Sequence, residues 1–309
     1  MIARLVALAS LFTISACGAS PRTAARVPPP TPMRTCLVLS VGADKGIAHL
    51  GAIAAVKQLG IPIQCVVGNS MGALVGSLYV TAPTIDTTQR YREFMGSYVA
   101  TTKSEAQDTG LAVGLLGAGL VLLSGGAALP VLAVGGGGYM VGAGSVDQIE
   151  IDRFSRVLDG YYRGARIEWL PVPFATMHEV ISTENGGMVD VRAGDLAEAV
   201  KGSVANPLIF PRLDPKRAGI LDPGVDRVAV TPVDDACRMF PHSRLIAINV
   251  SGQPVFTSNR MDCQVIEVDV PVVAVDHARV LKAEEPDFSM VVNAGYRATL
   301  AVLAPTATR

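Results

Sequence analysis

The sequence has little charge and few aromatic side chains. Of its 309 residues, 17% are charged and 5% are aromatic, and the formal net charge is −1. A near-neutral chain lacks the excess of basic residues with which many proteins hold nucleic acid, so we expect no nucleic acid as a partner. His49, His178 and His242 show no spacing typical of metal ligands. We expect neither a metal nor a cofactor.

The N-terminus lacks a hydrophobic run long enough to span a bilayer. Leu5 to Thr13 is a short apolar stretch, typical of an export signal. It leads into Ile14-Ser15-Ala16-Cys17, which resembles the bacterial lipobox, where a cysteine receives acyl chains. We therefore predict a lipoprotein signal over residues 1–17, lipidation of Cys17 and a location in the bacterial cell envelope. Gly18 instead of Asp favours the outer membrane. The alternative is an ordinary cleaved signal with a chance cysteine.

A proline-rich segment over residues 18–34 follows the predicted signal. Its prolines stand at positions 21, 28, 29, 30 and 32. Such a composition predicts an extended, semi-rigid tether. Residues 35–309 suffice for one α/β domain with a large core, so no second domain is needed.

Four further cysteines lie within this domain: Cys36, Cys65, Cys237 and Cys263. An exported protein meets oxidising conditions, so disulfides are allowed. Cys36 and Cys65 begin two apolar strands that flank one predicted helix, so they could be neighbours in a parallel sheet. We predict the pairs Cys36–Cys65 and Cys237–Cys263. The alternative is four small buried thiols.

The pattern around which the domain is organised is Gly68-Asn69-Ser70-Met71-Gly72. The apolar run Ile63–Val67 precedes it and the small-residue run Ala73–Val80 follows, which predicts a strand, a tight turn and a helix. We expect Ser70 to have a strained backbone, with the two glycines removing side chains that would clash. Its hydroxyl would then lie beside the free N–H groups of a helix N-terminus, which suits a nucleophile. The alternative is a plain glycine-serine turn.

A second loop precedes this turn. Cys36–Ser40 is typical of a buried strand, and Ile47–Leu59 has helical periodicity that ends at Gly60. The order strand, loop, helix, strand, turn, helix indicates a right-handed parallel unit. Both loops then lie at the carboxyl ends of adjacent strands, where α/β sheets build their sites.

These segments resemble the patatin-like phospholipases. LSVGADKGIAHLGAI is similar to the family's G-G-G-x-R-G loop and the helix after it, and AVKGSVANPLIFPRL to its A-S-x-A-x-P-x-x-F-P-P segment. The resemblance covers about residues 35 to 303. It implies an α/β, three-layer patatin-like fold with a mostly parallel central sheet and a G-x-S-x-G nucleophile elbow.

The resemblance also implies an acyl-ester hydrolase acting on lipids or phospholipids. Ser70 would be the nucleophile and Asp222 its direct base, as a dyad without histidine. The oxyanion hole would be built from the loop residues Gly42, Ala43, Asp44, Lys45 and Gly46, through backbone N–H groups. Val41, Ala43, Lys45 and Pro223 depart from the family's residues. They motivate an alternative, a weak or inactive patatin-like lipoprotein that binds lipid or a partner protein.

A rival mechanism uses a histidine. Ser70, Asp222 and His277 stand in the chain order of an ordinary α/β-hydrolase triad. Against this, the elbow follows only one earlier strand, and Val275-Asp276-His277-Ala278 is typical of a helix start.

The stretch between Asp108 and Asp147 contains no charged residue and is rich in glycine. We treat about 110–146 as an apolar insertion with three interpretations. It is a buried cap over the active site, a hairpin that dips into lipid and brings an acyl substrate to Ser70, or a transmembrane hairpin. The second would make the membrane a partner through this segment as well as through Cys17.

Overall fold

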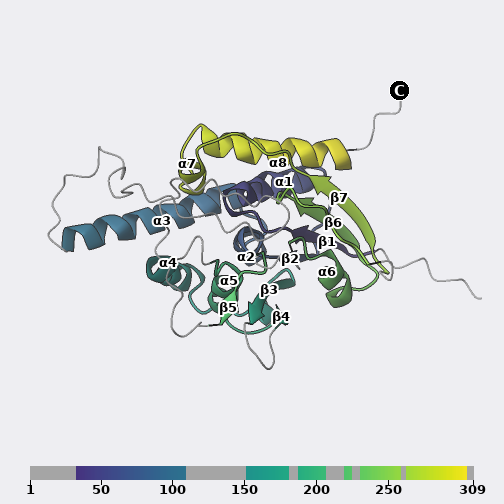
Figure 1. Cartoon of the computed structure of the whole chain (residues 1–309), viewed down its shortest axis with the longest axis horizontal. Helices are drawn as coiled ribbons and strands as arrows, with labels where there is room; N and C mark the ends of the chain where they lie inside the picture. Colours follow the sequence, from purple (N-terminus) through teal and green to yellow (C-terminus); the bar gives the residue numbers. More distant parts are fainter. Residues whose placement is uncertain are drawn as a thin grey trace, which may run out of the picture. The chain divides into compact units, whose positions relative to one another are not determined.

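A computed structural model of the chain describes residues 33–108, 151–180, 187–206, 219–224, 230–258 and 262–304. The predicted signal, the tether and the insertion at about 110–146 lie outside these residues. A seven-stranded sheet forms the centre of the described part (Figure 1). Its main path runs β4-β3-β2-β1-β6-β7, and β5 pairs with β3 beside that path.

The strands are β1 (Thr35–Leu39), β2 (Cys65–Gly68), β3 (Phe174–Val180), β4 (Gly187–Val191), β5 (Ile220–Leu221), β6 (Arg244–Asn249) and β7 (Gln264–Asp269). From β3 through β2, β1 and β6 to β7, every neighbouring pair is parallel. Only β4 and β5 run antiparallel to β3. The predicted α/β fold with a mostly parallel central sheet is confirmed.

The helices are α1 (Ala48–Gln58), α2 (Met71–Thr81), α3 (Thr87–Asp108), α4 (Ile151–Tyr162), α5 (Leu196–Ser203), α6 (Val233–Met239), α7 (His277–Leu281) and α8 (Asp287–Leu303). Two 3-10 helices, η1 (Ala43–Ile47) and η2 (Ile167–Trp169), complete the set for the described residues.

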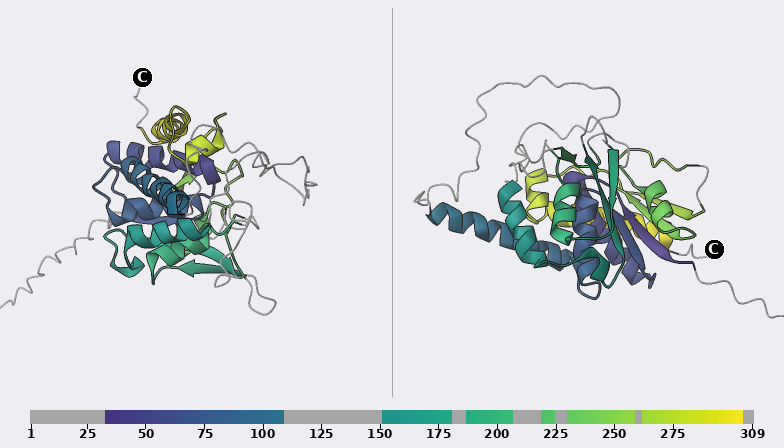
Figure 2. Two further views of the ribbon diagram at one scale, coloured as in Figure 1. Left: turned by 90° about the vertical axis from the view of Figure 1, so that its left-hand side faces the viewer. Right: turned by 90° about the horizontal axis from the view of Figure 1, so that it is seen from below.

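Helices cover both faces of the sheet, and alternation along the strands explains why (Figures 1 and 2). Successive side chains of a strand point to opposite faces. Leu37 and Leu39 of β1 join the larger core, which contains residues of α1, α2, α3, α4, α5 and α8. Cys36 and Val38 join a smaller core with Val233 and neighbouring residues of α6. Strands buried on both faces read as continuous apolar runs, which is how β1 appears in the sequence.

Helix α1, which follows the first loop, packs closely against the C-terminal helix α8 (Figure 1). A Cβ atom at Gly51 would overlap the carbonyl oxygen of Val292, and one at Gly295 would overlap that of Ala48. Because these are backbone atoms, no side-chain rotation could relieve the overlap. Helix α8 also contacts η1, so this packing helps to fix the loop at the end of β1.

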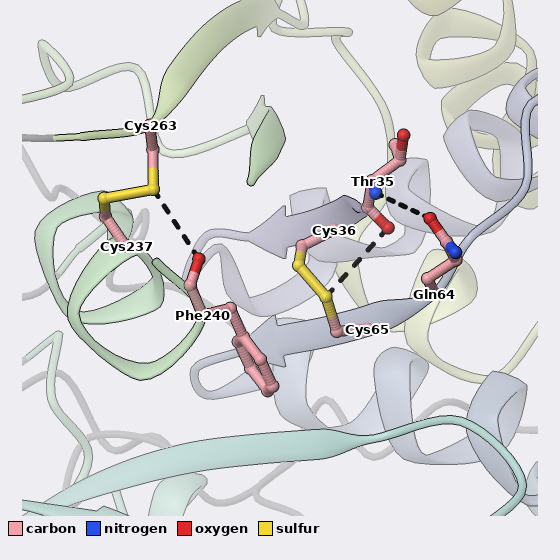
Figure 3. Close-up of a disulfide and its surroundings, with 7 residues drawn as sticks. All are labelled: Thr35, Cys36, Gln64, Cys65, Cys237, Phe240 and Cys263. Carbon is pink, nitrogen blue, oxygen red and sulfur yellow. Dashed lines mark hydrogen bonds between the residues drawn. A yellow bond between two sulfur atoms is a disulfide. The ribbon is translucent and has the colours of Figure 1, made fainter. Parts of the chain in front are cut away.

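Two disulfides are present, one within the sheet and one between α6 and the residue before β7 (Figure 3). Cys36 and Cys65 lie opposite each other in β1 and β2, with their Cα atoms 4.5 Å apart. The bond therefore joins the strand before the loop 40–46 to the strand before the turn at Ser70. Cys237 of α6 is joined to Cys263, just before β7, with a Cα separation of 5.8 Å. Both predicted pairs are present as bonds, whereas the sequence alone left four reduced thiols as the alternative.

Among the described residues, no helix combines the length and apolar character that crossing a membrane requires.

Candidate functional site

Ser70 occupies the sharp turn between β2 and α2. Its backbone has φ 54° and ψ −124°, a region that residues with a side chain rarely adopt. A Cβ atom at Gly68 would overlap the carbonyl oxygen of Gly72, and one at Gly72 would lie 2.5 Å from the carbonyl oxygen of Leu39. The two glycines therefore allow strand and helix to approach, as the sequence predicted, and the turn presents Ser70 at the N-terminus of α2.

Buried polar contacts hold this turn in place. The N–H of Ser70 donates to the hydroxyl of Ser203 at 3.0 Å, and Ser203, the last residue of α5, is fully buried. The side-chain oxygen of Asn69 accepts from the N–H of Met177 in β3 at 3.1 Å. Ser203 was missed as a site residue, although its segment AVKGSVANPLIFPRL carried part of the family resemblance. What the sequence could not give is its contact with Ser70, 133 positions earlier.

Asp222 lies directly after β5 and is 1% exposed. Its N–H donates to the carbonyl of Ala205, and its Oδ1 accepts from the N–H of Gly224 at 2.7 Å. Within the described residues its Oδ2 has no hydrogen-bond partner that meets normal geometry. Pro223 lacks an N–H, but the carboxylate loses nothing by this because Gly224 is the donor.

The structure brings Ser70 and Asp222 together. Burial raises the pKa of Asp222 to about 6, while the neighbouring Ser70 hydroxyl and the Gly224 N–H act in the opposite direction. A buried carboxylate beside a hydroxyl can act as a general base and accept the proton of that hydroxyl.

The loop after β1 runs beside this pair. Ala43 has φ 46°, in the left-handed region, and opens the 3-10 helix η1. A Cβ atom at Gly46 would overlap the side chain of Met71, the residue after Ser70. The first N–H groups of such a helix have no partner within it. Among the described residues, the backbone N–H groups of Gly42 and Ala43 donate to no carbonyl group of another loop or strand.

His277 does not form the triad that the rival mechanism required. Its Nδ1 lies 2.7 Å from Oδ2 of Asp44. Neither oxygen of Asp222 bonds to it: Oδ1 accepts from Gly224, and Oδ2 lacks a partner among the described residues. The triad prediction is therefore wrong for this structure, because the helix that begins at His277 turns the ring towards the loop after β1 instead.

His49 is a structural residue. It is fully buried, and its Nε2–H donates to the carbonyl oxygen of Ser40 at 2.9 Å. Burial lowers its pKa to about 4, so the ring is neutral at pH 7 and holds the end of β1 without adding charge to the site. Within the described residues, no cluster of three or more His, Cys, Asp or Glu side chains could hold a metal ion.

A strand, a strained serine turn and a helix, with a buried carboxyl beside the serine, define the class of α/β proteins with a nucleophile elbow. The family model described as patatin-like phospholipase matches residues 37–226. That range contains the last three residues of β1, the loop after it, Ser70 and Asp222. The chain belongs to the patatin-like phospholipase family.

Curated relatives match over a short stretch. Lysophospholipase NTE1 of Mycosarcoma maydis is 48% identical over 61 residues, and neuropathy target esterase sws of Drosophila persimilis is 46% identical over 59. Each match covers 19% of this chain but only 3% and 4% of those proteins. This chain therefore corresponds to a small part of their length.

Solved structures resemble the chain weakly. VipD from Legionella pneumophila gives a TM-score of 0.37 at 12% identity, covering 87% of this chain and 66% of that one. The complex of ExoU with SpcU from Pseudomonas aeruginosa gives 0.35 at 14% identity, covering 87% and 52%. Since these scores are low, the fold rests on the observed sheet and on the family match.

Proposed function

We propose that the chain is a serine hydrolase of lipid acyl esters, with Ser70 as nucleophile and Asp222 as base. The observation that carries the proposal is the buried carboxyl of Asp222, which lies beside the Ser70 hydroxyl. Family membership supports the reaction class, as do the names of two relatives, a lysophospholipase and an esterase.

In this mechanism the Ser70 hydroxyl passes its proton to Asp222 while its oxygen attacks the ester carbonyl carbon. The alcohol leaves with that proton, and an acyl-serine remains. Asp222 then takes a proton from water, the hydroxide attacks the acyl carbon, and the fatty acid is released as Ser70 is reprotonated. The N–H groups of Gly42 and Ala43 stabilise the oxyanion in both steps, at about 3 kcal/mol for each donor.

Covalent labelling tests the proposal. A fluorophosphonate probe should modify the wild-type chain at Ser70, located by mass spectrometry, and should not modify Ser70→Ala. The wild type should also hydrolyse a p-nitrophenyl ester and release fatty acid from lysophospholipid. Ser77→Ala is a matched control, since Ser77 lies buried within α2 and donates to the carbonyl of Leu74. A wild type that takes no label and cleaves neither substrate would favour the alternative, an inactive patatin-like lipoprotein that binds lipid or a partner.

We also propose that acylation of Cys17 anchors the protein in the bacterial envelope, at the outer membrane. The lipobox-like sequence and the proline-rich tether after it support this. Cys17→Ser should move the protein from the membrane fraction to the soluble fraction and abolish incorporation of labelled palmitate. Ser20→Ala, a change in the tether, should alter neither. Palmitate incorporation that persists in Cys17→Ser would refute the anchor.

A further inference from the structure

Asp44 and His277 form a contact that the proposed reaction does not use. Asp44 belongs to the loop that carries the oxyanion donors, and His277 is the first residue of α7, 233 positions later. The imidazole Nδ1 lies 2.7 Å from the carboxyl Oδ2. The Asp44 side chain is 10% exposed and the His277 side chain 43%, so the bond closes the loop on its solvent side.

The loop needs such a restraint because of Ala43. Its φ of 46° lies in the left-handed region, which glycine adopts freely and alanine adopts at a cost. Without an external contact, the backbone would relax towards negative φ at this position. That rotation would turn the peptide N–H groups at 42 and 43 away from their present direction.

His277 stands on a fixed support. The side chain of Asp276 caps α7 by accepting from the N–H groups of Ala278 and Arg279, at 3.0 and 3.2 Å. At the other end, the buried hydroxyl of Tyr91 in α3 donates to the carbonyl of Leu281 at 2.8 Å. Helix α7 also contacts both η1 and α8. Helix α7, which carries the imidazole, is therefore fixed by its contacts. The strained backbone lies in the loop, at Ala43, next to Asp44.

We propose that His277 is a positioning residue that, through Asp44, holds the oxyanion loop in its strained, donor-presenting conformation. The inference rests on the proposed hydrolase function. It assigns to His277 a role other than that of a catalytic base, since the ring touches the loop and not the Ser70–Asp222 pair. The bond matters for the transition state, where the oxyanion forms, more than for substrate binding.

The first test is kinetic. His277→Ala should lower kcat for ester hydrolysis about 10- to 100-fold, part of the loss expected for one oxyanion donor, with KM changed less than about threefold. His277→Asn, whose amide can still donate to Asp44, should keep most of the activity. His242→Asn is the matched control, because this exposed histidine lies in the turn before β6, at the opposite end of the parallel strands.

A double mutant separates loop positioning from a general effect on α7. In Ala43→Gly the left-handed conformation carries no penalty, so adding His277→Ala should then cost at most about threefold. A structural role confined to α7 would give the same loss in both backgrounds. Equal losses, or a His277→Ala enzyme as active as wild type, would overturn the inference.

Hydrogen exchange gives a readout that does not need catalysis. In His277→Ala, amides within 41–47 should exchange faster than in wild type, and in His242→Asn they should not. If the wild type neither hydrolyses esters nor takes the fluorophosphonate, the proposed function fails, and exchange alone then decides whether His277 holds the loop. Unchanged exchange would refute it. Should His277→Ala fail to fold, Asp44→Ala removes the same contact from the other side and faces the same criteria.

Discussion

Asp222→Asn is expected to lower kcat/KM for ester hydrolysis by about 10²- to 10⁴-fold, the usual contribution of a general base. The amide has nearly the shape of the carboxyl, but it cannot accept the proton of Ser70. Steady-state kinetics on a p-nitrophenyl ester would measure the loss. Asp262→Asn is the matched control, since Asp262 is exposed and lies in the segment before β7. A loss of less than about tenfold would remove Asp222 from the mechanism.

The same residue should link pH to activity. Because burial raises the pKa of Asp222 to about 6, the base becomes available only as the pH rises through that value. The wild-type kcat/KM should therefore increase between about pH 5 and pH 7 and then level off. A rising limb near pH 4, the usual range of an exposed aspartate, would show that the carboxyl is not desolvated as the structure indicates.

The free energy of unfolding should fall with rising pH, whereas the activity rises. The folded-state pKa lies above 3.8, the ordinary value of an aspartate, so the folded protein binds more protons between these two values than the unfolded chain does. Stability that is fully present below about pH 4 should be lost as the pH rises through about 6, by on the order of 3 kcal/mol. Asp222→Asn carries no such charge. It should be more stable than wild type at pH 8, and chemical denaturation at pH 4 and pH 8 would show the difference.

Local patterns predicted the parts of the site that lie within one strand-turn-helix unit. The glycines around Ser70 and the apolar run before it specify the turn by short-range sterics alone, and the structure has that turn. The parallel pairing of β1 with β2 followed from the helix between them, and with it the place of Cys36 opposite Cys65.

Contacts between distant segments were not predictable in this way. Nothing in the residues near Ser203 says that its hydroxyl meets the N–H of Ser70. The order of residues in the sequence suggested a bond between His277 and Asp222, yet the structure pairs His277 with Asp44. The partner of His277 depends on how α7 packs against η1. The hydrophobic periodicity of the sequence carries no information about that packing. Helix α6, with its seven residues, was too short for a helical period to reveal.

The second large effect is expected from Gly72→Ala. An added Cβ would lie 2.5 Å from the carbonyl oxygen of Leu39 and 2.7 Å from that of Ser40. Leu39 is the last residue of β1 and Ser40 follows it, so α2 would have to move away from the sheet. Overpacking of this kind costs about 1–3 kcal/mol, and more where only backbone can yield. Because Ser70 directly precedes α2, a displacement of the helix by about 1 Å should also cost on the order of 10²-fold in kcat.

Gly160→Ala in α4 is the matched control for this change. A Cβ at Gly160 would meet nothing within 4 Å, so the substitution should be neutral or should stabilise the helix by up to about 1 kcal/mol. Urea denaturation of both variants gives the free energies of unfolding, and the rate of fluorophosphonate labelling reports the position of Ser70. If Gly72→Ala matched Gly160→Ala in both measurements, the close approach of α2 to β1 would be wrong. The hydroxyl of Ser70 would then owe its position to some other contact.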